Sequence, residues 1–116
     1  MSSYVVNVMQ LALDDDPLDP GQIVSGDPQV THRLIDAAAD GGVQRGVWQI
    51  TPGVVTDTEA DEMFVVVSGR ASIELLDSGT ILHVNPGDMV VLHAGERTRW
   101  TIHETLRKVY QTSGAA

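Results

Sequence analysis

Cysteine is missing from this sequence of 116 residues, and the chain also has few basic and few aromatic residues. Without cysteine there can be no disulfide, no thiolate zinc site and no cysteine nucleophile. A small secreted domain held together by disulfides is therefore not expected, although the lack of cysteine does not itself exclude export.

Basic residues are the second shortage. Seven Lys and Arg face sixteen Asp and Glu, which gives a formal net charge of −9. This charge disfavours long-range attraction to nucleic acid or to anionic lipid. No apolar run is long enough to span a membrane, and no basic segment followed by an apolar core marks a signal peptide. We expect a cytoplasmic protein whose partners include neither nucleic acid nor a membrane.

The sequence does contain short, β-branched apolar segments separated by glycine-centred turns. Residues 46–51 alternate apolar and polar side chains, while residues 63–67 form a continuous apolar run typical of a strand buried on both faces. Further strands are expected at residues 4–13, 22–25, 30–39 (ending in a loop), 54–58, 71–76, 80–84, 89–92, 97–103 and 106–111. No segment has a convincing amphipathic helical period. The pattern predicts a single all-β domain, a small barrel or sandwich.

Two boundaries and one turn follow from the same pattern. Residues 1–21 are expected to form an N-terminal strand or arm with an acidic, solvated loop, residues 22–111 the barrel, and residues 112–116 a flexible tail. Ser68-Gly69-Arg70 is predicted to reverse the chain, so that the strands on either side pair as a hairpin.

Two motifs resemble those of the cupin superfamily. Glu62, six residues and then Gly69 match the end of the first cupin motif. Gly87, residues 93–95 and Thr98 follow the spacing of the second, with His93 where that motif usually has a proline.

Residues 46–53 and 100–110 resemble one cupin branch in particular, the short ureidoglycine-aminohydrolase-like and ethanolamine-utilisation-Q-like proteins. The resemblance covers about residues 24–111. It implies a cupin-type double-sheet jelly-roll barrel, often a homodimer, with a site inside the mouth of the barrel.

The departures from the cupin pattern concern the metal site. Metal-binding cupins hold a divalent ion with two His, one Glu and a third His, and here the three His positions correspond to Thr56, Thr58 and Thr98. Hydroxyls are poor ligands for transition metals, so only Glu62 remains and we expect no metal and no cofactor. A non-standard site built from Glu59, Asp61 or a displaced His stays open.

The resemblance places a set of side chains in the barrel. The predicted lining is Thr56, Thr58, Glu62, Phe64, Thr98 and Trp100. Glu62 has two interpretations: a structural hydrogen-bond acceptor, or a substrate anchor and general acid/base. Inside an apolar barrel its pKa is raised unless a cation pairs with it, and the candidate partners are Arg97, Arg99 and Lys108.

The histidines and the other tryptophan are interpreted mainly as structural. His103 is expected outside the barrel and His93 near its rim, while a structural role is favoured for His32 and His83. Trp48 is more typical of a core side chain than of a ligand platform. No two histidines have close ligand spacing.

Three functions remain. The leading hypothesis is a cupin without the usual metal that binds a small polar metabolite. One alternative is a hydrolase or isomerase acting on a ureido, amino or sugar-like metabolite with Glu62 as acid/base, and another is a non-catalytic structural or regulatory dimer whose barrel is filled by side chains. No nucleophile elbow or phosphate-binding glycine loop is present.

Overall fold

The computed structural model describes residues 2–114, and most of them form β-strands. Nine strands follow one another, with one short 3₁₀ helix, η1 (Pro20–Gln22), before the second. The strands are β1 (Asp14–Asp15), β2 (Ile23–Gly26), β3 (Val30–Ala37), β4 (Val43–Ile50), β5 (Gly53–Thr58), β6 (Asp61–Leu75), β7 (Thr80–Val84), β8 (Met89–Leu92) and β9 (Arg97–Ser113). Within residues 2–114 no helix is long and apolar enough to cross a membrane.

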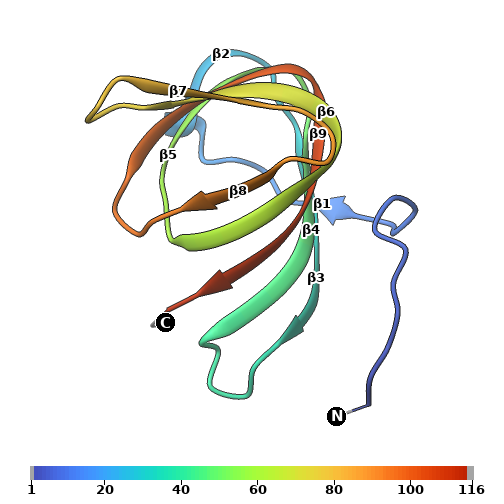
Figure 1. The fold of residues 1–116 in the computed structure, drawn as a ribbon. Coiled ribbons are helices and arrows are strands. Elements are labelled where there is room, and N and C mark those ends of the chain that lie inside the picture. Colours follow the sequence, from blue (N-terminus) through green and yellow to red (C-terminus); the bar gives the residue numbers. More distant parts are fainter. Residues whose placement is uncertain (1, 115–116) are drawn as a thin grey trace.

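Two antiparallel sheets share the long strands β6 and β9, which bend from one sheet into the other. The first sheet has the order β1-β3-β4-β9-β6-β8 and uses the C-terminal half of β9 and the N-terminal half of β6. The second has the order β2-β5-β9-β6-β7 and uses the other halves. The sheets curl around a common interior (Figure 1). This arrangement confirms the predicted all-β double-sheet barrel.

The bend in β6 is where one prediction was wrong. Gly69 does not reverse the chain, because β6 continues through it from Asp61 to Leu75. Gly69 has a φ of 82°, and the pairing of β6 with β9 shifts register around it. A Cβ at Gly69 would lie 1.9 Å from the carbonyl oxygen of Thr105. Glycine is therefore required for close approach of the two backbones at a bulge, rather than for a hairpin turn.

Strand β9 corrects the sequence interpretation in the same way. The two strands predicted at 97–103 and 106–111 are one continuous strand. Thr112 and Ser113, predicted to lie in the flexible tail, pair with β4 and β6. Residues 115–116 of that predicted tail lie outside the described residues.

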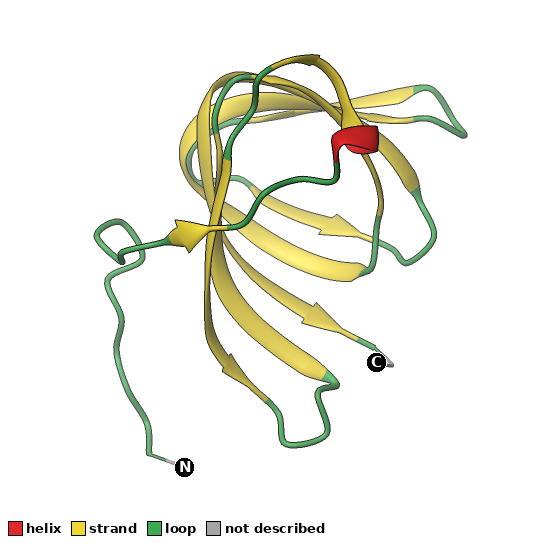
Figure 2. Ribbon diagram, turned by 180° about the vertical axis from the view of Figure 1, so that it is seen from behind, coloured by secondary structure: helices red, strands yellow, loops and turns green. Residues whose placement is uncertain are grey.

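The N-terminal segment also differs from its prediction. Residues 4–13 form no strand, but a turn at residues 8–10 and an arm outside the barrel (Figure 2). The Arg107 guanidinium donates to the carbonyl oxygens of Val8 (2.8 Å) and Leu11 (2.6 Å). These two carbonyl oxygens thus have hydrogen-bond partners although no neighbouring strand pairs with this segment. The first strand, β1, instead falls within the predicted acidic loop.

Alternate side chains of the strands fill the interior. The largest fully buried ones include Phe64, Ile50, Ile73, Leu92 and Leu106. Burying each contributes about 1.5–3 kcal/mol. Residues 63–67 are not buried on both faces as predicted, since Met63 is 37% exposed while Phe64 is fully buried. The outer face of β6 therefore carries apolar side chains that residues 2–114 cover only in part.

Candidate functional site

A cavity of about 410 Å³ lies between the two sheets. Strands β3, β4, β6 and β9 of the first sheet contribute to its wall, β5 and the start of β9 come from the second, and the segment from Asp16 to Gln22 adds a further side. Its volume is in the range of small-molecule sites. Its aromatic lining is Trp48, Trp100 and Tyr110, and its ionisable lining is Asp16, His32, Asp57, Glu59, Glu62 and Lys108.

The strand register explains why residues so far apart in sequence meet here. His32 on β3 is paired with Trp48 on β4, which is paired with Lys108 on β9. Thr112 on β9 is paired with both Gln44 and Glu62. Since side chains alternate between the faces of a strand, residues two apart in each row point to the same interior.

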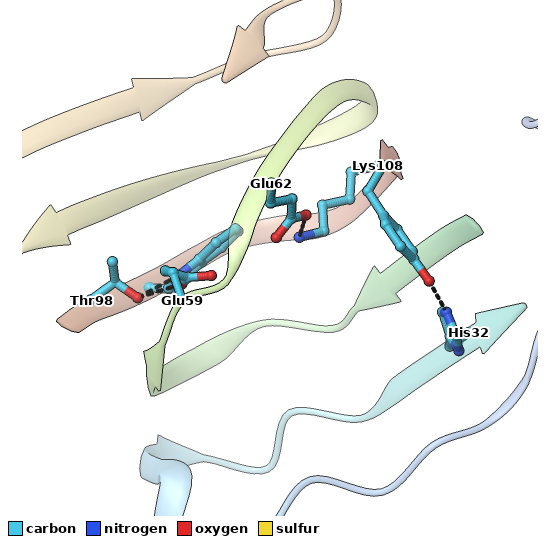
Figure 3. Close-up of polar contacts among 7 residues, drawn as sticks. His32, Glu59, Glu62, Thr98 and Lys108 are labelled. Carbon is cyan, nitrogen blue, oxygen red and sulfur yellow. Dashed lines mark hydrogen bonds and ion pairs between the residues drawn. The ribbon is translucent and has the colours of Figure 1, made fainter. Parts of the chain in front are cut away.

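Glu62 and Lys108 form an ion pair in this interior. The Lys108 Nζ atom lies 2.7 Å from Glu62 Oε2, and the two side chains are only 7% and 9% exposed, respectively. Figure 3 shows the two side chains pointing toward each other. The ammonium also lies 4.4 Å, 4.7 Å and 4.9 Å from the ring centroids of Phe64, Trp48 and Trp100. The carboxylate and the three aromatic faces together stabilise a cation that is largely removed from water.

Glu59 is a second buried carboxyl group, and its partners are neutral. Its Oε2 atom accepts hydrogen bonds from the Thr98 hydroxyl (2.6 Å) and the Trp100 indole N–H (3.1 Å). Burial raises the pKa of Glu59, and the charge of Asp57 raises it further, against the opposing effects of these hydrogen bonds and of Lys108. Burial also raises the pKa of Asp57. Both carboxyl groups therefore hold their protons at higher pH than ordinary side chains.

Tyr110 and His32 form the third polar contact. The Tyr110 hydroxyl oxygen and His32 Nε2 are 2.5 Å apart, and His32 Nδ1 lies 4.0 Å from Asp16 Oδ2. Gly46 makes this contact sterically feasible, because a Cβ there would lie 2.6 Å from the Tyr110 hydroxyl. Burial, and then the charges of Glu62 and Asp16, raise the pKa of Tyr110. The phenol is thus a neutral proton donor at the wall of the cavity.

The six predicted lining residues have different positions. Thr56, Glu62 and Trp100 line the cavity. Phe64 and Thr98 are fully buried, Phe64 against the ammonium of Lys108 and Thr98 as a donor to Glu59. Thr58 is exposed and lies in an adjoining surface depression beside Leu76 and Arg97.

Several lining residues were absent from the predicted set. From sequence, His32 and Trp48 are interpreted as structural, Lys108 is only a candidate partner for Glu62, and Tyr110 has no predicted role. The available signal was parity: Trp100, Lys108 and Tyr110 are separated by even numbers of residues. Splitting β9 into two strands removed that signal, because parity cannot be carried across a loop. His103 is exposed, as expected.

The side chains present do not fit the metal site that the cupin pattern implies. Thr98 donates a hydrogen bond from its hydroxyl to Glu59, Thr58 is exposed and does not line the cavity, and Glu62 is paired with Lys108. Across residues 2–114, no group of three or more His, Cys, Asp or Glu is arranged to hold a metal ion. Hydroxyls, a lysine and aromatic faces are a poor donor set for a transition metal.

Comparison with known proteins places the fold in a family. A model described as the EutQ-like cupin domain matches residues 37–110. The chain belongs to the EutQ-like cupin family. No curated protein matches it.

Solved structures of cupins share the barrel. A protein of unknown function of the DUF861 family from Pseudomonas syringae pv. tomato is 27% identical, with a TM-score of 0.80 over 90% of this chain and 45% of that chain. This chain therefore spans less than half the length of that relative. A putative ethanolamine utilization protein Q from Salmonella typhimurium is 19% identical, with a TM-score of 0.66 over 76% of this chain and 72% of the other.

The polyketide cyclase RemF from Streptomyces resistomycificus has the same fold. It is 18% identical, with a TM-score of 0.67 over 97% of this chain and 80% of that one. At this identity the likeness extends to the fold alone.

Proposed function

We propose that this cupin binds a small polar organic molecule in the cavity between its sheets. The observation that carries the proposal is the buried Glu62–Lys108 pair at the wall of a 410 Å³ cavity. Removing two charges from water is costly, and a barrel that served only as a scaffold would be at least as stable with apolar side chains there. A polar pair retained beside open space supports a ligand-binding role over a barrel filled by side chains.

The two tryptophans make this proposal easy to test. Trp48 and Trp100 are the only tryptophans in the sequence, and both line the cavity. Screening of a metabolite library by thermal shift, followed by titration monitored by tryptophan fluorescence, should give at least one compound with saturable binding. Glu62→Gln should weaken the binding of that compound about tenfold, because a charged hydrogen-bond partner is lost.

The matched control is Glu104→Gln, which makes the same change on the exposed end of an ion pair with Arg70. It should leave the affinity unchanged. Absence of any compound that binds, or equal affinity of wild type and Glu62→Gln, would contradict binding in this cavity.

An acid–base enzyme is the second candidate, and the Tyr110–His32 contact favours it. A neutral phenol at the cavity wall can donate a proton to a substrate, and His32, whose side chain is 27% exposed, can return it from solvent. The reaction class is hydrolysis or isomerisation of a ureido, amino or sugar-like metabolite. Glu62 is the sequence-based candidate for the base, and it forms an ion pair with Lys108 at the wall of the cavity.

Kinetics would test this second candidate. Once a compound is found that binds, NMR can follow its conversion in the presence of the protein. Tyr110→Phe should abolish conversion while leaving binding within about threefold, since the phenol is assigned to proton transfer. Unchanged conversion by Tyr110→Phe would contradict the assignment.

We also propose a homodimer, supported by the apolar outer face of β6 and β8. Met63 and Val91 are paired across these strands, and Met63, Met89 and Val91 are 37%, 65% and 52% exposed. Exposed apolar patches of this kind mark association surfaces. Light scattering should give twice the mass of 12.5 kDa, and Val91→Glu should reduce it to that of one chain. We propose separately that the protein is cytoplasmic, and cell fractionation would test this.

A further inference from the structure

The cavity contains more negative than positive groups. Among the described residues that line it, Lys108 is the only Lys or Arg, and its charge is matched by Glu62. Three further acids, Asp16, Asp57 and Glu59, line the same space. Asp16 lies near His32, but within residues 2–114 neither Asp57 nor Glu59 forms an ion pair. Among the described residues, the cavity lining therefore contains more acidic groups than cations that pair with them.

The aromatic walls have the same chemistry, because they already hold one cation. Trp48 and Trp100 present ring faces close enough to the Lys108 ammonium to attract it. The negative quadrupole of such faces stabilises cations and gives nothing comparable to anions. Glu59 reinforces the pattern: the residue is 7% exposed, and both of its hydrogen bonds go to Oε2, which leaves Oε1 without a protein donor among the described residues.

We propose that the cavity selects a small organic cation, an amine or quaternary ammonium compound, over neutral and anionic molecules of the same shape. This inference rests on the proposed binding function and gives its ligand a chemical class. An anion would meet Lys108 only in competition with Glu62, and would also face the other acids. A bare metal ion is disfavoured because no three suitable donors converge within residues 2–114.

Protons should compete with such a ligand. Burial raises the pKa values of Asp57 and Glu59, so both carboxyl groups hold protons more readily than ordinary side chains. A bound cation favours the ionised carboxylates and lowers both pKa values. Binding should therefore release protons and tighten as pH rises. The other ionisable groups around the cavity are Asp16, His32, Glu62, Lys108 and Tyr110.

Matched probes test the charge preference directly. Choline, 3,3-dimethylbutan-1-ol and 3,3-dimethylbutanoate share a shape but are cationic, neutral and anionic, and benzylamine, benzyl alcohol and benzoate form a second set. Each is titrated while the indole N–H signals of Trp48 and Trp100 are recorded by NMR. In at least one set the cation should bind about tenfold more tightly than the neutral compound, with the anion weakest.

Glu59→Gln sharpens the test, because a carboxamide oxygen can still accept from Thr98 and Trp100. The cation should bind about tenfold less tightly to this variant, the neutral compound should be unaffected, and proton release measured with a pH electrode in unbuffered salt solution should fall. Glu104→Gln, with the same change of charge on the surface, should behave as wild type.

Three results separate the possible failures. If a neutral or anionic probe binds as tightly as the cation, the charge preference is wrong but small-molecule binding stands. If Glu104→Gln weakens binding of the cation as much as Glu59→Gln does, only the net charge of the protein matters and the cavity assignment is wrong. If no probe and no library compound shifts the indole signals, both the inference and the proposed function are wrong.

Discussion

Glu59 and Glu62 are three residues apart and both are nearly inaccessible to solvent, yet their charges are stabilised in different ways. Glu62 is paired with the ammonium of Lys108. Glu59 accepts hydrogen bonds only from neutral groups, a hydroxyl and an indole N–H, and burial raises its pKa. The cavity thus has a carboxyl group paired with a cation at one place and a carboxyl group with a raised pKa and neutral partners at another. Such a division of roles is what binding sites and acid–base centres require.

Removing the Lys108 ammonium should have the largest effect on stability. Lys108→Met leaves the Glu62 carboxylate buried among aromatic rings, at an expected cost of about 3–5 kcal/mol in the free energy of unfolding at pH 7. Chemical denaturation measures it. Arg99→Met is the control, since Arg99 lies 3.9 Å from Glu74 on the surface and should lose no more than about 1 kcal/mol. Equal losses in the two variants would contradict a special role for the buried pair.

Removing both charges should restore part of that stability. The double variant Glu62→Gln/Lys108→Met has no unpaired buried charge, so it should be about 2 kcal/mol more stable than additivity of the single variants predicts. A double-mutant cycle in urea gives this coupling energy. A coupling near zero would mean that the 2.7 Å contact contributes nothing in solution.

Removing a hydrogen bond to Glu59 should reduce stability less than removing the Lys108 ammonium. Thr98→Val keeps the volume but removes a hydrogen bond to the carboxyl group, at a cost of about 1–3 kcal/mol. The loss should be greater at pH 8 than at pH 5, because the hydroxyl mainly stabilises the ionised form. Thr101→Val, on the same strand with the opposite parity, is the control. A loss independent of pH would show that the hydroxyl does not stabilise the carboxylate.

Neutralising Glu59 should have the smallest effect and the opposite sign. The pKa of Glu59 is raised in the folded protein, so between the unfolded and folded pKa values the folded state binds more protons and stability falls as pH rises. Glu59→Gln lacks this penalty and should be about 1 kcal/mol more stable than wild type at pH 7. Below the unfolded pKa the advantage should vanish. Stability curves with the same slope for both proteins would contradict a raised pKa.

The strand pattern and the glycine turns sufficed to predict the barrel, because burial with a period of two leaves a clear signature in sequence. Strands β7 and β8 have the bounds expected for them. The two long strands were broken in the prediction because Gly69 has the same local signature in a bulge as in a turn. Only the backbone of Thr105, far along the chain, distinguishes the two cases.

The site was harder to predict than the fold. Glu62, placed by the cupin motif, and Trp100, placed by its parity with Thr98, are two of the expected residues that lie at the cavity wall. The partnership of Lys108 with Glu62 depends on the register of β6 against β9, and that register shifts at bulges that sequence does not reveal. Glu59 follows the end of β5, where alternation stops, so its burial against Trp100 could not be read from parity.

The most direct test of the account is titration of the ¹⁵N-labelled protein with its best-binding compound while the two indole N–H signals are observed. The account predicts that the signals of Trp48 and Trp100 both shift and saturate at one dissociation constant, and that Glu62→Gln weakens it about tenfold. Shifts confined to backbone signals of the outer face of β8, with both indole signals unmoved, would contradict a ligand site between the sheets.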